Sequence, residues 1–392
     1  MRWKAKKLSD CCTSIADGDH QAPPKVDFGI PFVTISNINA YHQFDFTDTM
    51  FVSQEYYDQL DSKRKAQEGD VLYSVVGSFG IPVYMKETVP FAFQRHIAIL
   101  RSNDTILPQF LYYTMLSRDF YMMADAAALG AAQRTVSLTA LRNMKISVPP
   151  MDAQKKITDI LSAYDDLIEN NQKQIKLLEE AAQRLYKEWF VDLRFPGHET
   201  TPIVDGLPDG WEIQTLSQIA DVVMGQSPKS EFYNQDRQGL PFHQGVGSYG
   251  TRFVIDTTYS TSFTRIAEAG SILFSVRAPV GRLNITKNKI VIGRGLAAIN
   301  HRSGMQSYLF YLLKERFFKD NIIGNGAIFA SISKDELLGQ KFIVPVDDLV
   351  KRFNTVVSDI DGKIAGLENQ IMLLTESRDR LLPKLMSGEI EV

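Results

Sequence analysis

The sequence has few of the residues that mark secreted, membrane or metal-binding proteins. Its only two cysteines, Cys11 and Cys12, are adjacent, which suits neither a disulfide framework nor a zinc site, so we expect packing roles. The six histidines show no metal-ligand spacing, and no metal is predicted. No apolar run approaches the roughly 18 residues that span a bilayer, and no signal-peptide core opens the chain. We expect a globular, cytoplasmic protein with no membrane partner.

Catalytic motifs are also missing. The phosphate-binding pattern G-x-x-x-x-G-K-[ST] does not occur, nor does a glycine-rich dinucleotide fingerprint after a strand. An amino-methyltransferase would show Asn or Asp before Pro-Pro and an aromatic residue, but the two Pro-Pro pairs stand in "APPK" and "VPPM". A nuclease Glu-x-Lys pattern fails after "PDGWE", where Gln214 replaces the lysine. We therefore expect a non-catalytic chain that binds no cofactor itself.

A strong charge of either sign is absent. The formal net charge is -3, and a basic surplus occurs only in residues 201–345, with 15 basic against 12 acidic side chains. Overall charge therefore gives weak support for DNA binding, and contact with phosphates would need local patches or a basic partner.

An internal repeat is present instead. The stretch "GAAQRTVSLTALRNMKISVPP" at 130–150 matches "GAIFASISKDELLGQKFIVPV" at 326–346, at an offset of 196 residues. Further upstream, "GDVLYSVVGSFG" from Gly69 matches "GSILFSVRAPVG" from Gly270, and Trp3 corresponds to Trp211. The two halves therefore predict two similar domains that contain the same elements in the same order.

Each repeated domain is followed by a long helical pattern. From Asp152, and again 196 residues later, apolar residues recur in heptads over 35 to 40 residues, or about 55 to 60 Å of helix. Asn171 interrupts this seam, where it either fixes the register of a coiled coil or is partly exposed. The predicted helix–helix seam comprises Leu161, Tyr164, Ile168, Asn171, Ile175, Leu178, Leu185, Ile360, Ile364, Leu367, Ile371, Leu374 and Leu381.

These patterns predict an α+β fold with two similar mixed α/β domains, at residues 1–150 and 211–346. Two long helices, at 151–192 and at 347–392 with the C-terminal tail, separate the domains and pack as an antiparallel coiled coil with pseudo-two-fold symmetry. A linker rich in Pro and Gly occupies 193–210.

The strand–turn–strand segments of both halves are candidates for DNA contact. Hairpin tips can enter a DNA groove and present polar side chains to phosphates or base edges. Ordinary surface or strand-end roles remain the alternative for every one of these residues. The candidates are Ser74, Ser78, Arg95, His96, Gln133, Arg134, Arg277, Arg282 and Arg294.

Four quoted segments together carry a family resemblance. They are "AQRTVSLTALRNMKISVPPMDAQKKITDIL", "LLEEAAQRLYKEWFVDLRFPGH", "LPDGWEIQTLSQIA" and "RLLPKLMSGEIEV". Over its whole length the chain resembles the specificity subunit of Type I restriction-modification enzymes. It departs from the pattern at "VPVDDLVKRF", where Val346 and Val350 stand for the second proline and the glutamine of "PPMDAQKKI".

The resemblance implies a DNA-recognition subunit. Each domain would be a target recognition domain that reads one half of a bipartite, asymmetric site in double-stranded DNA, and the helices would bind two methyltransferase subunits. Restriction/translocase subunits would complete the complex, with S-adenosylmethionine, ATP and Mg on the partner subunits. Two other interpretations remain: a coiled-coil adaptor that binds proteins only, and the recognition chain of another restriction-modification system.

Overall fold

The computed structural model describes residues 3–21, 23–130, 133–317 and 331–392. The repeated residues 326–330 lie outside the described ranges. The chain forms two compact units, the first made of Met1–Asn171 with Gln370–Val392 and the second of Gln172–Asn369. Each unit therefore contains one mixed α/β domain together with part of each long helix.

The domain of the first unit has two larger sheets and one two-stranded pair, with a separate core on each face of one central strand. Its elements are β1 (Lys4–Lys7), α1 (Leu8–Cys11), β2 (Cys12–Asp17), β3 (Ile30–Val33), η1 (Ile35–Asn37), β4 (Met50–Val52), α2 (Gln54–Gln59), β5 (Val71–Ser74), β6 (Pro82–Tyr84), β7 (Ala92–Phe93), β8 (Ile97–Ser102), α3 (Pro108–Leu116), α4 (Arg118–Ala127), α5 (Leu138–Asn143) and β9 (Lys145–Val148). The larger sheet is antiparallel, in the order β2-β8-β5-β6. A second sheet has the order β4-β3-β7, and β1 pairs with β9.

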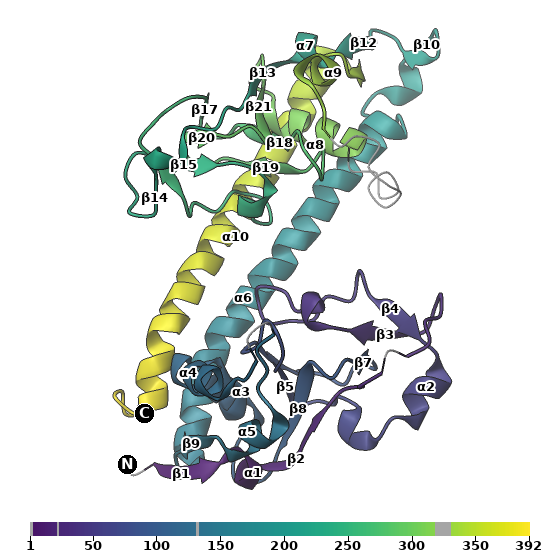
Figure 1. Cartoon of the computed structure of the whole chain (residues 1–392). Coiled ribbons are helices and arrows are strands. Elements are labelled where there is room, and N and C mark those ends of the chain that lie inside the picture. Colours follow the sequence, from purple (N-terminus) through teal and green to yellow (C-terminus); the bar gives the residue numbers. More distant parts are fainter. Residues whose placement is uncertain (1–2, 22, 131–132, 318–330) are drawn as a thin grey trace. The chain divides into compact units, whose positions relative to one another are not determined.

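The domain of the second unit has the same plan (Figure 1). Its elements are β12 (Glu212–Thr215), α7 (Leu216–Ile219), β13 (Ala220–Met224), β14 (Tyr233–Asn234), β15 (Leu240–His243), η6 (Val246–Ser248), β16 (Tyr259–Ser260), β17 (Ile266–Ala267), β18 (Ile272–Ser275), β19 (Leu283–Ile285), β20 (Ile290–Ile292), β21 (Leu296–His301), α8 (Gln306–Phe317), α9 (Lys334–Leu338) and β22 (Lys341–Val344). Its four-stranded sheet has the order β13-β21-β18-β19, its second sheet the order β14-β16-β15-β20-β17, and β12 pairs with β22. The repeat predicted from the sequence is thus confirmed for the four-stranded sheets and for the terminal strand pairs, while the second sheet gains β14 and β17 in the second domain.

The repeated strand is buried on both faces, which explains why it reads as a continuous apolar run. In β5, Val71 and Tyr73 face the core that contains α3, whereas Leu72 faces the core that contains Phe91. In β18, Phe274 faces the α8 core and Leu273 faces the opposite core. Both domains are therefore two-layered around this strand.

A serine repeated at an offset of 196 begins a short helix in each domain. The Ser137 hydroxyl accepts a hydrogen bond from the Ala140 N–H at 3.1 Å, and the Ser333 hydroxyl accepts one from the Glu336 N–H at 3.3 Å. Both serines are N-caps, which satisfy backbone donors that a helix end leaves unpaired. The matched sequence around 137 and 333 thus preserves a turn that leads back to the long helices.

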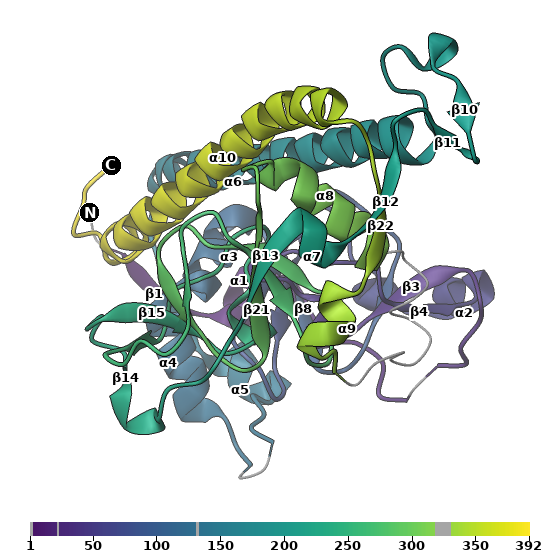
Figure 2. The same cartoon turned by 90° about the horizontal axis from the view of Figure 1, so that it is seen from above.

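The two long helices are α6 (Met151–Tyr186) and α10 (Asp347–Ser387), with 36 and 41 residues. Figures 1 and 2 show them side by side. Within the first unit Asp165 pairs with Arg378, and within the second the Tyr186 ring contacts Phe353. The later residue of α6 thus contacts the earlier residue of α10. The two helices are therefore antiparallel, as predicted.

The predicted seam faces the protein interior throughout. Leu161, Ile168 and Ile175 are buried, and the remaining apolar seam positions of both helices are buried or half-buried. Asn171 is also buried, and its side-chain N–H donates to the Gln370 side-chain oxygen at 3.2 Å. Partial exposure of Asn171 is therefore wrong, and its amide pairs across the helices in the manner of a register-fixing polar residue.

The linker contains more regular structure than the sequence indicates. After a single π-helical turn at Lys187–Val191, the chain forms a hairpin from β10 (Ile203–Val204) and β11 (Leu207–Pro208), labelled at the edge of Figure 2. Asp205 and Gly206 form its two-residue turn with φ of 51° and 83°. An Asp-Gly pair with two positive φ values is the preferred connection for such a hairpin.

The two cysteines pack within the first domain. Cys11 is buried and Cys12 half-buried, and both are free. Burial raises the pKa of the Cys12 thiol to about 12, which keeps it protonated and unreactive at neutral pH. Within the described part of the chain, every helix is too short or too polar to cross a bilayer.

Candidate nucleic-acid interface

Each four-stranded sheet ends in a hairpin turn that is closed by a buried serine. The Ser74 hydroxyl donates to the Ser78 carbonyl oxygen and accepts from the Ile81 N–H, both at 2.9 Å. The Ser275 hydroxyl does the same with the Pro279 carbonyl oxygen at 2.6 Å and the Arg282 N–H at 2.8 Å. Our assignment of Ser74 as a DNA contact is therefore wrong, because the side chain is fully buried and shapes the turn.

Replacing the buried serine is expected to destabilise its unit rather than alter recognition directly. Ser275→Ala leaves the Arg282 N–H without its acceptor, which we expect to lower the free energy of unfolding by about 1 to 3 kcal/mol. Ser78→Ala removes only an exposed side chain and is expected to change it by less than about 0.5 kcal/mol. Urea unfolding of both variants measures this, and equal effects would contradict the structural role of Ser275.

Three separate segments meet at the hairpin turn of the first domain. The Val75 N–H donates to the His96 carbonyl oxygen at 2.8 Å, which brings Arg95 and His96 to the turn. The Gly77 N–H donates to the Arg134 carbonyl oxygen at 2.9 Å, which brings the segment from Gln133. Five candidates far apart in the sequence therefore lie at one edge of one sheet: Ser78, Arg95, His96, Gln133 and Arg134.

The second domain repeats this convergence with different side chains. The Val276 N–H donates to the Gly295 carbonyl oxygen at 2.9 Å, and the Ile332 N–H donates to the Val276 carbonyl oxygen at 3.0 Å. Arg294 therefore occupies the place that Arg95 has in the first domain, next to Gly295 where the first domain has His96. Arg277, Arg282 and Arg294 are all exposed at this edge.

The arginines at these edges differ in what they contact. The Arg134 guanidinium pairs with the carboxylate of Asp125 and lies over the Phe79 ring, 5.4 Å from its centroid. Arg134 is therefore engaged in organising the turn. Among the described residues, the guanidinium groups of Arg95, Arg277 and Arg294 have no hydrogen-bond or ion-pair partner.

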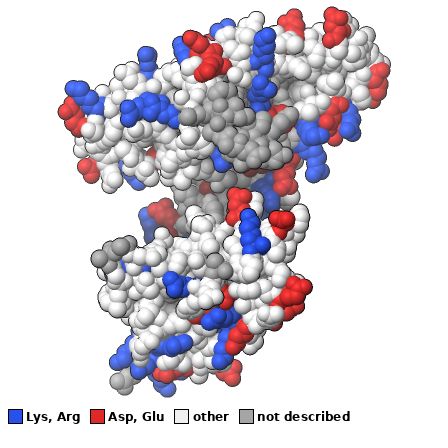
Figure 3. Space-filling model, turned by 45° about the vertical axis from the view of Figure 1, so that its right-hand side comes forward, with Lys and Arg blue, Asp and Glu red and all other residues white. Residues whose placement is uncertain are grey.

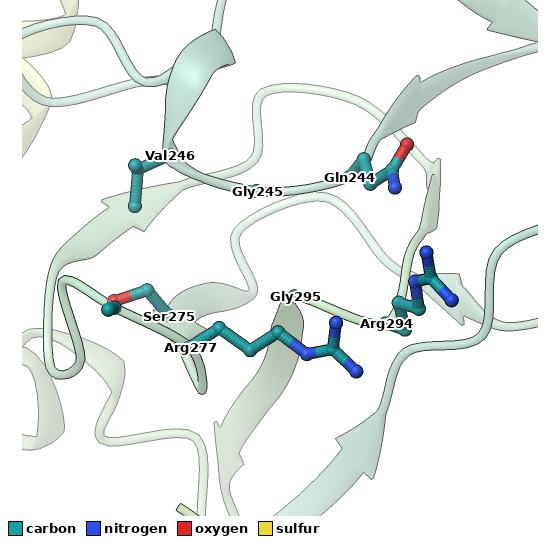
Figure 4. A pocket seen from close by; sticks show the side chains of 8 residues that line it. Gln244, Gly245, Val246, Ser275, Arg277, Arg294 and Gly295 are labelled. Atoms are coloured by element: carbon teal, nitrogen blue, oxygen red, sulfur yellow. The ribbon is translucent and has the colours of Figure 1, made fainter. Parts of the chain in front are cut away.

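Arg277 and Arg294 line the same pocket of the second domain. The pocket has a volume of about 190 Å³, and its other lining residues are Gln244, Gly245, Val246, Ser275, Ala278 and Gly295. Figure 4 shows both guanidinium groups on the same side of the pocket, with the Gln244 side chain near Arg294. The two guanidinium groups and the amide are hydrogen-bond donors, a chemistry that suits an electron-rich polar ligand.

Sequence reasoning missed the Gln244–Val246 wall of this pocket. These residues follow β15, whose partner β20 leads directly to Arg294. The Gly295 N–H donates to the Gln244 carbonyl oxygen at 3.1 Å, so the pairing of the two strands brings both turns together. The repeat carries the signal that could have found this wall, because β3, the counterpart of β15, likewise ends at a short 3-10 turn.

Two histidines near these edges have different environments. Burial, reinforced by the positive charge of Arg95, lowers the pKa of His96, which favours a neutral imidazole at pH 7. His243, at the end of β15, is buried and contacts the Ser248 hydroxyl at 2.7 Å and the Asp256 carboxylate at 2.9 Å. The His243 contact holds the pKa of Asp256 below its usual range. His96 is therefore available as a neutral contact, whereas His243 has a packing role.

Neither basic nor acidic side chains dominate the one face of the molecule that Figure 3 shows. On the face shown in Figure 3, basic and acidic side chains are interspersed over both units. Across the described residues, no group of three or more His, Cys, Asp or Glu side chains is arranged to hold a metal ion. Any nucleic-acid contact would therefore depend on local positions such as Arg277 and Arg294.

Known proteins similar to this chain share its two-domain plan. Residues 2–180 and 208–372 match the family described as the Type I restriction modification DNA specificity domain. The chain is 25% identical to the Type I restriction enzyme MjaIX specificity subunit of Methanocaldococcus jannaschii, over 100% of this chain and 94% of that protein. It is 23% identical to the Type I restriction enzyme HindI specificity subunit of Haemophilus influenzae, over 99% of both chains.

The fold also resembles that of a solved structure. The crystal structure of the Type I restriction-modification system S subunit from M. genitalium superposes with a TM-score of 0.58 at 16% identity, covering 98% of this chain and 96% of that one. The family match extends over both domains and most of both long helices. The chain therefore belongs to the Type I restriction-modification DNA specificity family and is a non-catalytic specificity subunit that recognises DNA.

Proposed function

We propose that each domain reads one half of a bipartite, asymmetric site in double-stranded DNA, at the edge where its hairpin turn meets the turn before the last sheet strand. The observation that carries this proposal is the matched convergence of polar side chains at equivalent edges. Equivalent backbone hydrogen bonds, from the Val75 N–H and the Val276 N–H, frame the two edges, but Arg277 stands where the first domain has Val76, and Gly295 where it has His96. Because equivalent backbone positions carry different side chains in the two domains, we expect each domain to recognise a different half-site.

We further propose that residues 151–192 and 347–392 bind two methyltransferase subunits, and that restriction/translocase subunits complete the complex. Exposed apolar side chains recur at an offset of 196 on the two helices, as Ile160 with Val356 and Leu177 with Leu373. Repeated exposed positions support two equivalent docking surfaces for two copies of one partner. S-adenosylmethionine, ATP and Mg would be held by those partners, because the chain lacks the motifs for them.

Two alternatives make different predictions. A coiled-coil adaptor that binds only proteins would show no sequence-dependent affinity for duplex DNA when its partners are supplied. The recognition chain of another restriction-modification system would co-purify with a single partner that both cuts and methylates. The unpaired arginines of the second-domain pocket favour the DNA-reading subunit over the adaptor.

Removal of the two pocket arginines is expected to damage one half-site only. A lost bidentate base contact costs about 1 to 3 kcal/mol, so Arg277→Ala with Arg294→Ala should relax base preference in the half-site read by the second domain. Base preference in the other half-site should be unchanged. Base-resolved methylation mapping, in cells that supply the methyltransferase partner, measures both preferences separately.

The matched control is Arg302→Ala. Arg294 precedes β21, whereas Arg302 follows the opposite end of that strand. Arg302 forms an exposed ion pair with Asp221 at 3.2 Å. Its loss should leave both half-sites intact. Uniform weakening at all sequences by the pocket variant would instead identify phosphate contacts, and no effect would remove the pocket from the interface.

A further inference from the structure

The second domain buries an arginine against the long helices. Arg252 stands at the tip of a tight turn between Tyr249 and Val254, which are bridged to each other, and it is only 2% exposed. Its guanidinium lies 3.7 Å from the centroid of the Phe310 ring, on α8. It is one of the largest fully buried side chains in the described residues, in a position where sequence reasoning found no candidate.

The groups that receive this arginine lie on both long helices. Its Nη2 donates to the Asp361 carboxylate on α10, and its Nη1 lies 3.8 Å from the Glu179 carboxylate on α6. The Arg252 backbone N–H donates to the Glu368 carboxylate at 3.2 Å, and Lys287 lies 3.5 Å from the same group. One turn of the domain is thus connected to three carboxylates on two helices.

This turn is a further place of attachment, in addition to the contacts that α8 makes with both helices. Among those contacts is an apolar cluster in which Tyr308 of α8 packs against Phe353 of α10. Phe353 and Glu368 are 15 residues apart on one helix, or about 22 Å. A body held at one contact can rock about it, whereas a second contact at this distance fixes its angle.

We propose that Arg252 is a positioning residue that fixes the angle of the second domain on α6 and α10, and thereby the gap allowed between the two half-sites. The inference rests on the proposed reading of a bipartite site. Each base pair added to a gap advances the duplex by about 3.4 Å and rotates it by roughly 35°. A domain held rigidly allows recognition at one gap length only. A domain that can rock also allows recognition at gaps one base pair longer or shorter.

Stability alone is a poor explanation of this arrangement. A buried ion pair is often no more stabilising than apolar side chains of similar volume, and the Arg252 Nε has no partner among the described residues. Such pairs are better suited to selecting one geometry among several. The contacts of Arg252 therefore point to orientation rather than to a contribution to the core.

The first domain attaches differently. Asp165, which corresponds to Asp361 at the offset of 196, pairs with Arg378 from α10 and accepts from the Tyr113 hydroxyl at 2.6 Å. The corresponding turn of the first domain carries His42, whose Nδ1 lies 3.0 Å from the Pro82 carbonyl oxygen. In the first unit the guanidinium of Arg378 thus joins helix to helix, and the domain itself reaches α6 with a lysine, Lys86, which pairs with Asp166 at 2.8 Å. Among the described residues, the second domain makes the equivalent link with a buried arginine.

The test uses the full chain with its methyltransferase partner and a plasmid library. The library holds both wild-type half-sites separated by the wild-type gap and by gaps one and two base pairs longer or shorter. Arg252→Met with Asp361→Leu removes both charges without leaving either one buried and unpaired. Arg252→Lys retains the charge, and Arg302→Met is the control for the loss of an exposed arginine of the same domain.

For each chain we compare methylation at gaps one base pair longer or shorter with methylation at the wild-type gap. The double variant should raise this ratio about tenfold over wild type, as expected for loss of a coupled contact network. Base preference within each half-site should be kept. Arg252→Lys should lie between wild type and the double variant, and Arg302→Met should match wild type.

Three results would overturn the inference. One is a folded double variant with wild-type discrimination between gaps, and another is loss of base preference in the second half-site without a change in gap tolerance. The third is the absence of bipartite methylation with the wild-type chain. This result does not depend on any variant, so it identifies failure of the proposed function itself.

Discussion

Insertion of four helix-forming residues after Asn171 and four after Asn369 is expected to lengthen the recognised gap by one to two base pairs. Both positions lie at the boundary between the two compact units, and α6 and α10 each cross it without interruption. Four residues add about 6 Å to a helix, close to the rise of two base pairs. The half-site sequences should be unchanged, because neither domain is altered.

The apolar seam should survive this insertion. Four residues nearly preserve the buried face of each helix and produce a stutter in the coiled coil rather than a break. The matched control inserts the same four residues after Gly206, at the turn of the β10–β11 hairpin, where the chain lengthens but the helices do not. Methylation mapping should show the wild-type gap for the control. An active helix variant that keeps the wild-type gap would show that the helices do not set the distance.

Phe353→Ala is expected to cause a large loss of stability in the second unit. Phe353 is fully buried, and its ring packs against Tyr186, Phe190 and Tyr308 at centroid distances of 5.7, 5.0 and 6.3 Å. Truncation of such a residue costs about 3 to 5 kcal/mol, because the cavity is only partly refilled. Thermal unfolding of the isolated chain should show one transition lowered by roughly 10 °C.

Val356→Ala is the matched control on the same helix. Val356 is exposed, three residues from Phe353, and its loss should change the free energy of unfolding by less than about 0.5 kcal/mol. A loss below about 1 kcal/mol for Phe353→Ala would contradict the assignment of this cluster as an anchor of the second domain.

The features best predicted from the sequence are those in which residues recur at a regular spacing. The heptads around Ile168 and Ile364 predict two long helices, because an apolar residue every 3.5 positions leaves few other structures that bury it. The repeat at 196 predicts two domains with the same elements in the same order, and the structure confirms both long helices and the matching four-stranded sheets. The hairpin candidates Arg277 and Arg294 come together because β18 and β21 pair, a long-range contact that the sequence does not predict.

The features that sequence missed depend on three-dimensional context. Ser74 and Ser78 look alike in a turn, yet only the first is buried and bonded to the backbone. Arg252 stands in a glycine-rich loop with no pattern to distinguish it from a surface arginine. Its role depends on carboxylates more than 70 residues before it and 100 after it in the chain. Periodicity does not encode contacts of this kind.

Base-resolved methylation mapping of DNA from cells with and without this chain, in the presence of its methyltransferase partner, tests the central claim most directly. We predict methylation that depends on the chain and falls at one asymmetric sequence, split into two different half-sites by a gap of fixed length. Methylation that is the same with and without the chain, or that falls at a continuous or palindromic sequence, would contradict the claim that the two domains read two different half-sites.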